Sequence, residues 1–172
     1  DNAMRNDPFD RGTLRSSGIF LQDEVRLGRA TVMAGLRQDR VTGDARSKGA
    51  GPAMVTEGLR HEDDMLSWSV GATWALADGL SPYLNLSRGV RAADLRERFE
   101  DSARGDGYYH VGNPQLRPER ATAVEAGIKA RQHWGDWQVA VFHTRIDDYI
   151  AGRTTGMVHA GTGLPVKQVE NL

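Results

Sequence analysis

The chain has 172 residues, which is enough for one ordinary domain, and 39% of them are hydrophobic and 26% charged. A formal net charge of −1 gives no case for binding to nucleic acid, and the absence of cysteine excludes disulfides and thiolate metal sites. No run of about 18 apolar residues occurs, which excludes a transmembrane helix but not membrane-spanning strands, because these are apolar only at alternate positions.

The first predicted hairpin has strands from about Gly18 to Leu27 and from Ala30 to Val41, joined by a turn at Gly28-Arg29. Alternation with a period of two residues is typical of a strand with one apolar and one polar face. In the first strand Ile19, Leu21, Asp23, Val25 and Leu27 alternate with Phe20, Gln22, Glu24 and Arg26.

The second predicted hairpin has the most regular alternation. Its first strand places Leu66, Trp68, Val70, Ala72, Trp74 and Leu76 on one face and Ser67, Ser69, Gly71 and Thr73 on the other. An Asp-Gly turn at Ala77 to Gly79 leads into a strand with Leu84 and Leu86 on one side. Trp68 and Trp74 lie roughly 20 Å apart along the strand, a spacing that fits two aromatic girdles beside an apolar band.

A third hairpin is predicted from Thr122 to Gln132 and from Trp137 to Ile150, with a last strand from Leu164 to Leu172. Long polar connections are predicted at Thr42 to Met65, Ala92 to Arg120 and Ala151 to Gly163, with a short helix or turn at Ala92 to Glu100. Short turns that alternate with long loops are unusual in a compact soluble domain and typical of outer-membrane barrels. The pattern leaves open a soluble β-sandwich with tryptophans in its core.

Four segments resemble motifs of one protein family. Gly112 to Glu119, with the sequence GNPQLRPE, and the following Glu125-Ala126-Gly127 resemble the NPxLxPE and ExG signature of TonB-dependent outer-membrane receptors. Val90 to Leu95 resembles the family's FRAPxL segment but has Val90 for the aromatic residue and Ala93 for the proline. The segments Gly35 to Asp39 and Ile146 to Ile150 resemble the family's GxRxD and IxDYI strands.

This resemblance implies an all-β fold, an antiparallel up-and-down meander that is part of a 22-stranded transmembrane barrel. We expect residues 1–172 to supply about six or seven of its strands, without the N-terminal plug domain and the TonB box. The resemblance also implies a place in the bacterial outer membrane, contact with its lipid, and coupling to TonB through the missing N-terminal part. The cargo would be a ferric siderophore or another metal chelate, haem included.

The signature residues are expected to shape the barrel rather than to bind a ligand. The prolines restrict the residues before them to extended conformations, and Pro118 lacks a donor where strand pairing begins. Glu125 should point into the lumen beside Gly127. This set of structural residues is Asn113, Pro114, Leu116, Pro118, Glu119, Glu125 and Gly127.

Ligand-binding candidates are Tyr108, Tyr109 and His110, which precede the signature in a loop that the resemblance places outside the cell. In haem receptors of the family this interval can hold a haem-ligating histidine. The alternative is a solvent-exposed loop histidine without a ligand. The charged segment His61 to Asp64 could hold a cation, but it is more simply a solvated loop.

No histidine has a metal-ligand spacing and no serine lies in a nucleophile motif, so we predict neither a resident metal or cofactor nor an enzyme. Energy-coupled uptake of a ferric siderophore or related chelate is the leading hypothesis. A passive or structural outer-membrane barrel and a soluble carbohydrate-binding β-domain remain as alternatives.

Overall fold

The computed structural model describes residues 9–49 and 54–172. Its strands are β1 (Thr13–Leu27), β2 (Ala30–Asp44), β3 (Arg60–Trp74), β4 (Leu80–Arg91), β5 (Asp101–Ala103), β6 (Tyr109–Val111), β7 (Glu119–Gln132), β8 (Gly135–Asp147), β9 (Ile150–Val158) and β10 (Pro165–Asn171). One short helix, α1 (Leu95–Phe99), follows β4. In the described part of the chain, no helix is long and apolar enough to cross a membrane.

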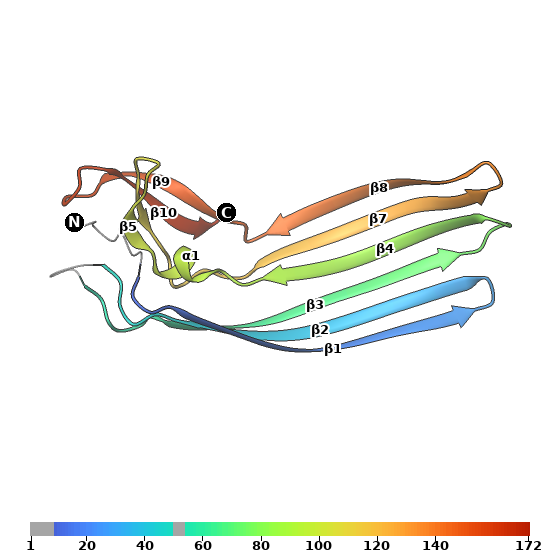
Figure 1. The fold of residues 1–172 in the computed structure, drawn as a ribbon, viewed down its shortest axis with the longest axis horizontal. Helices are drawn as coiled ribbons and strands as arrows, with labels where there is room; N and C mark the ends of the chain where they lie inside the picture. Colours follow the sequence, from blue (N-terminus) through green and yellow to red (C-terminus); the bar gives the residue numbers. More distant parts are fainter. Residues whose placement is uncertain (1–8, 50–53) are drawn as a thin grey trace.

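Two sheets divide the molecule along its long axis (Figure 1). Six long strands form an antiparallel meander in the order β1-β2-β3-β4-β7-β8, which we call the wall. Four short strands form a second sheet in the order β5-β6-β10-β9, in which β10 pairs with β6 in parallel. We call this second sheet, together with α1 and residues 112–118, the cap. The all-β meander expected from the sequence is therefore confirmed.

All three predicted hairpins are present. The strands of the first two extend beyond the predicted bounds at the loop ends, whereas the return strand of the third ends at Asp147 rather than at Ile150. The first strand begins at Thr13 rather than at Gly18, and the strand of the second hairpin begins at Arg60 rather than at Leu66. The sequence does not show these extensions, because the strand ends near the loops are charged, as at Arg60 to Asp64. There the hydrophobic alternation stops before the backbone pairing does. The predicted loop Thr42 to Met65 shrinks accordingly, and its residues 50–53 lie outside the described residues.

The prediction of a loop at Ala151 to Gly163 is wrong, because β9 occupies most of this segment. The polar Gly/Thr-rich sequence pairs with β10, so the ladder is stabilised by backbone bonds rather than by an apolar face. The predicted strand at Leu164 to Leu172 is confirmed as β10, although it joins the second sheet and not the wall. The short helix expected within Ala92 to Glu100 is confirmed as α1.

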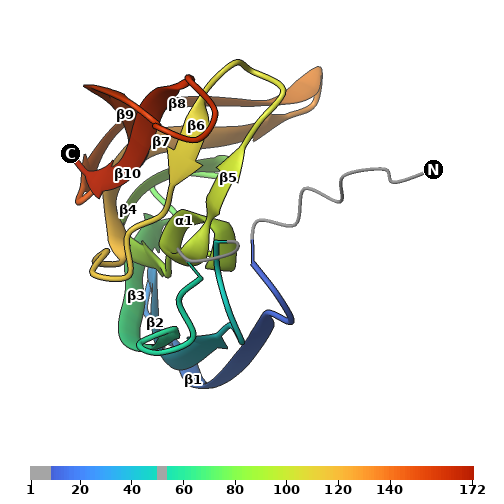
Figure 2. The same ribbon diagram turned by 90° about the vertical axis from the view of Figure 1, so that its left-hand side faces the viewer.

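The wall is curved, and α1 lies on its concave side (Figure 2), which we call the inner face. Ser67, Ser69, Gly71 and Thr73 share this face with Asp63, whose carboxylate contacts α1. The opposite, outer face carries most of the large apolar side chains, and Val70 and Val141 remain 41% and 70% exposed. The usual arrangement of a soluble sheet is thus inverted, because the larger apolar face is the one that nothing in the described chain covers.

Buried side chains gather instead where the cap meets the inner face. Phe99 is fully buried, and Leu116 packs in a small core with Ala93, Ile150 and Val169. These residues come from α1, the signature loop and the second sheet, so this core joins segments that are far apart in sequence.

Candidate functional site

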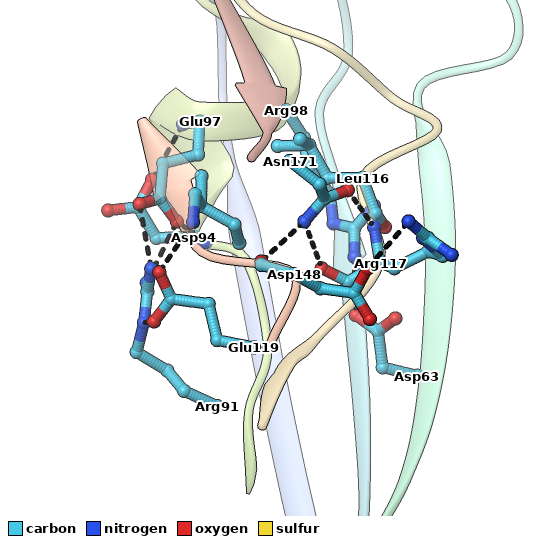
Figure 3. A network of polar contacts seen from close by, with 11 residues as sticks. Asp63, Arg91, Asp94, Glu97, Arg98, Leu116, Arg117, Glu119, Asp148 and Asn171 are labelled. Carbon is cyan, nitrogen blue, oxygen red and sulfur yellow. Dashed lines mark hydrogen bonds and ion pairs between the residues drawn. The ribbon is translucent and has the colours of Figure 1, made fainter. Parts of the chain in front are cut away.

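The NPxLxPE segment lies at the junction of the two sheets, where buried Arg98 of α1 holds it in place. Arg98 is 2% exposed and donates Nη1 to the carbonyl oxygens of Pro114 at 2.9 Å and Leu116 at 3.0 Å. Its Nη2 donates to Asp63 Oδ2 at 2.6 Å, on the inner face of β3 (Figure 3). One guanidinium therefore connects α1, the signature loop and the wall.

The signature loop is shaped by its own side chains. Asn113 Oδ1 accepts a bond from the Gln115 backbone N–H at 2.9 Å, an Asx turn that replaces a backbone turn. This turn directs Leu116 into the core, where it is 1% exposed. Gly112 leaves no room for a side chain, because a Cβ there would lie 2.7 Å from the Arg98 carbonyl oxygen.

Glu119, the last residue of the segment, accepts hydrogen bonds from a backbone N–H and from a guanidinium group. Its Oε1 accepts from the Ile150 backbone N–H at 2.6 Å and its Oε2 from Arg91 Nε at 2.7 Å. Arg91 also reaches Glu97 through both terminal nitrogens, at 2.9 and 3.1 Å. The Arg91 hydrogen bond, and then the Ile150 N–H, hold the pKa of Glu119 below its usual value. Hydrogen bonds to Glu119 and then to Glu97 raise the pKa of Arg91 in turn.

A second set of contacts ties the end of the wall to β10. Asp148 adopts a positive φ of 58° between β8 and β9, and its carboxylate accepts Arg117 and Arg120, each at 2.6 Å. Asn171 accepts a bond from the Arg117 N–H at 2.9 Å and donates to the carbonyl oxygens of Arg117 and Asp148. The IxDYI segment and the signature segment thus meet at one junction (Figure 3).

Glu125 and Gly127 lie on the inner face of β7, further along the wall. Glu125 Oε1 accepts the Tyr83 hydroxyl at 2.5 Å, and that hydroxyl accepts Gln138 Nε2 at 2.7 Å. A Cβ at Gly127 would lie 2.7 Å from the Tyr83 ring, so glycine makes room for the ring. Lys129 lies 5.0 Å from the centre of the same ring. This inner surface is polar and internally hydrogen-bonded, as a water-filled or plugged lumen allows.

The three ligand-binding candidates are divided between different environments. His110 lies in β6 with its side chain 7% exposed, and its Nε2 is 2.8 Å from Asp106 Oδ2, an interaction that lowers the pKa of Asp106. Tyr109 stacks on His159, with ring centres 3.6 Å apart and an angle of 4° between the planes. The ammonium of Lys167 lies 5.4 Å from the centre of the Tyr108 ring.

Burial, and then a hydrogen bond to Asp101, raises the pKa of Tyr109 to about 12. Among residues 9–49 and 54–172, no three histidine or carboxylate side chains gather in a way that could hold a metal ion.

Sequence reasoning missed Arg98, Asp63 and His159. Arg98 lies three residues after the segment that resembles FRAPxL, and nothing in its local sequence indicates burial. Asp63 was assigned to a solvated loop, yet its side chain is 6% exposed. A signal existed in the alternation of β3, because Asp63 and Met65 continue the inner-face positions of Ser67 and Ser69.

The apolar band on the outer face runs diagonally across the wall. On β8 the upper edge of the band is at Val141. Successive residue pairs across the intervening strands connect Val141 with Val25 of β1, so these two residues are at the same height along the strands. On β1 the same face continues to Ile19 with one charged residue, Asp23. The distance from Val25 to Ile19 is six residues, about 20 Å along the strand, and β1 and β8 are five strand spacings apart, about 24 Å. The upper edge of the band is therefore inclined by about 40° to the lines of paired residues that cross the strands. Strands of closed barrels are tilted by 35–45°.

Comparison with known proteins agrees with this geometry. A family model described as "TonB dependent receptor-like, beta-barrel" matches residues 1–172. No curated protein sequence matches the chain.

Solved structures with the same fold include the copper transporter OprC, with 18% identity and a TM-score of 0.73 over 94% of this chain. A mutant of the Serratia marcescens haemophore receptor HasR, in complex with its haemophore and haem, has 20% identity and a TM-score of 0.73 over 93% of the chain. The siderophore receptor PirA from Pseudomonas aeruginosa has 19% identity and a TM-score of 0.60 over 94% of the chain.

The chain spans only 24%, 30% and 37% of these three structures, in the same order. At these identities the likeness is one of fold, whereas the match to the family extends over the full sequence. The chain belongs to the TonB-dependent receptor β-barrel family.

Proposed function

We propose that the chain forms part of a closed outer-membrane barrel that takes up a ferric siderophore or a related metal chelate. In this proposal, the missing strands and an N-terminal plug come from outside residues 1–172. Energy is supplied by TonB through that plug. The wall provides a segment of the barrel, its inner face lines the lumen, and the cap forms extracellular structure above the lumen.

The observation that carries the membrane placement is the diagonal apolar band. A soluble β-sandwich would bury this face against a second sheet, but in the described residues no element covers it. An inclination of about 40° is what a horizontal lipid layer imposes on tilted strands. The band therefore supports a barrel wall in lipid over a soluble carbohydrate-binding domain.

The choice of cargo rests on the neighbours. A copper transporter, a haemophore receptor and a siderophore receptor are three proteins whose cargo is a metal ion or a metal complex. A metal chelate is therefore the substrate class that we assign, without choosing among its members.

Of the three candidates Tyr108, Tyr109 and His110, we propose the two tyrosines as the ligand contacts. Aromatic faces and the Lys167 ammonium suit a planar or anionic chelate. His110 is the weakest of the three, because its ring is buried and bonded to Asp106. We expect His110→Ala to leave chelate affinity unchanged within about twofold. Tyr109→Ala, which also unstacks His159, should weaken binding by about tenfold.

The test is uptake of radiolabelled chelates by cells that carry the complete receptor as their only outer-membrane route for iron. Uptake should require both the receptor and TonB, whereas surface binding should persist in cells without TonB. Uptake that persists without TonB would favour a passive barrel. Binding of a soluble glycan instead of any chelate would contradict the proposal.

A further inference from the structure

A row of four residues crosses the outer face of β3, β4, β7 and β8. Trp68 pairs with Arg88, Arg88 with Thr122, and Thr122 with Arg145. Residues directly opposite one another in neighbouring strands point to the same side of the sheet. All four therefore share the face that carries the apolar band.

This row lies just above the upper edge of the band on three of these strands. Two residues below Arg88 and Thr122 on the same face are Leu86 and Val124, which pair with each other and are exposed. On β8 the band ends at Val141, with His143 between it and Arg145. In the membrane placement proposed above, on which this inference rests, Trp68 lies within the band, while Arg88, Thr122 and Arg145 lie above its inclined edge, in the region of the lipid headgroups.

The two arginines retain donors for an outside partner. Arg88 donates Nε to Thr122 Oγ1 at 3.3 Å and forms no ion pair with any residue in 9–49 and 54–172. The Arg145 side chain is 76% exposed, with one contact to Asp147 at 2.9 Å. A guanidinium has five N–H donors, so most of those on each side chain are available.

Arg40 provides the contrast on the same outer face. Its Nε lies 3.2 Å from Glu62 and 2.9 Å from Asp64, so two carboxylates already neutralise it. By contrast, Arg88 has no carboxylate partner among the described residues, and Arg145 has one, Asp147.

We propose that Arg88, Thr122 and Arg145 bind the phosphate group of an outer-leaflet membrane lipid whose acyl chains lie on the adjacent apolar band. Arg88 and Arg145 are two strand spacings apart, about 10 Å between Cα atoms, so both long side chains can reach one phosphate. Arginine suits phosphate because its planar fork donates two parallel bonds, and the Thr122 hydroxyl is a third donor group beside the two guanidinium groups. The lipid chains supply the apolar contact that a free phosphate lacks.

The experiment uses the complete receptor in an uncharged detergent and measures bound lipid by native mass spectrometry. Phosphatidic acid is the probe, diacylglycerol is the same lipid without phosphate, and inorganic phosphate is the competitor. Phosphatidic acid should bind and diacylglycerol should not. The double variant Arg88→Gln/Arg145→Gln should bind phosphatidic acid at least about tenfold more weakly.

The matched control Arg40→Gln should keep its affinity within about twofold, because that arginine is already paired. Circular dichroism shows whether each variant retains its β structure. Equal binding by the double variant, or equal binding of diacylglycerol, would overturn the proposal. Displacement of the lipid by an equal concentration of inorganic phosphate would also overturn it, since it would identify a soluble-anion site.

The lipid site and the transport function can fail separately. Chelate uptake should survive in the double variant, because neither arginine lies on the inner face or in the cap. A receptor that binds phosphatidic acid but takes up no chelate would retain the lipid site and refute the uptake proposal.

Discussion

The wall and the cap are built from the same kind of strand but stabilised from opposite directions. In the wall, most large apolar side chains, such as Val70 and Val141, face outwards, and the inner face is mostly polar. In the cap, Phe99 and Leu116 are buried inside the protein, together with the charged Arg98 and Glu100. In the membrane placement proposed above, lipid covers the apolar face of the wall, whereas the cap has its own core.

This difference predicts where each region is sensitive to mutation. A change on the outer face of the wall should matter only when lipid surrounds it. A change in the junction between cap and wall should matter in lipid and in detergent alike, because its partners belong to the same chain. The predictions below test this division.

The largest effect is expected from Arg98→Ala in the complete receptor. The substitution leaves the buried Asp63 carboxylate and the carbonyl oxygens of Pro114 and Leu116 without this donor. Breaking one side of a buried ion pair costs about 3–5 kcal/mol. Hydrogen exchange at the amides of residues 112–117 should report a loss of local stability of that size.

The control for this change is Arg96→Ala, on the exposed side of the same helix, which should alter exchange by less than about 0.5 kcal/mol. Asp63→Asn should act in the same direction as Arg98→Ala. If Arg98→Ala and Arg96→Ala had equal effects, the junction would not depend on the buried pair.

In the wall, the comparable change is Val70→Lys, at the middle of the outer-face stretch of β3. A lysine facing lipid near the membrane midplane costs about 2–4 kcal/mol. Its neighbour Ser69 points to the inner face, so Ser69→Lys keeps its charge in water and should cost less than about 1 kcal/mol. Urea unfolding of the receptor in lipid vesicles compares the two. Equal costs would contradict the assignment of faces.

The wall could be predicted from the sequence because its information is local. Alternation from Leu66 to Trp74 fixes the faces, and short turns fix the registers. What alternation could not locate were the outer ends of the strands. There the charged residues Arg60 to Asp64 continue the ladder without an apolar pattern.

The cap was harder because its contacts join segments distant in sequence. The signature motif indicated that Pro114 and Leu116 would shape the structure, but not that Arg98 would hold their carbonyl oxygens. The strand β9 was missed because its pairing with β10 is a property of the backbone. Burial of His110 likewise results from the pairing of β6 with β5 and β10, which no local pattern shows.

A smaller effect is expected from Asn171→Ala in β10. Its side chain makes three hydrogen bonds, to the Arg117 N–H and to the carbonyl oxygens of Arg117 and Asp148. Their loss at a half-buried position should cost about 1–2 kcal/mol, since partners near the surface regain some water. Faster amide exchange at Arg117 measures it. The exposed Gln168 of the same strand gives the control Gln168→Ala, and equal acceleration in both variants would refute the specific role of Asn171.

The smallest effect is a dependence of the junction on pH through Glu119. Arg91 and the Ile150 N–H hold the pKa of this carboxyl below its ordinary value of 4.5. A lowered pKa in the folded state means that the contribution to stability is complete above pH 4.5 and is lost as pH falls through the folded value. Protonation removes the acceptor charge on which Arg91 and the N–H of Ile150 depend, so the start of β9 should open first. Amide exchange at Ile150, corrected for intrinsic rates from about pH 7 to about pH 3, should show this opening.

Glu119→Gln keeps an oxygen acceptor but cannot titrate, so it separates this carboxyl from other acid-sensitive groups of the cap. One such group is Asp106, whose pKa is lowered by His110. In Glu119→Gln the exchange of Ile150 should be faster at neutral pH and nearly independent of acid, while the region around Asp106 should still respond. An unchanged acid response at Ile150 in this variant would assign the sensitivity to another carboxylate. By contrast, amides in the middle of the wall should stay protected throughout, because the buried carboxylates of the wall, Asp39 and Asp63, lie towards the end of the strands that meets the cap.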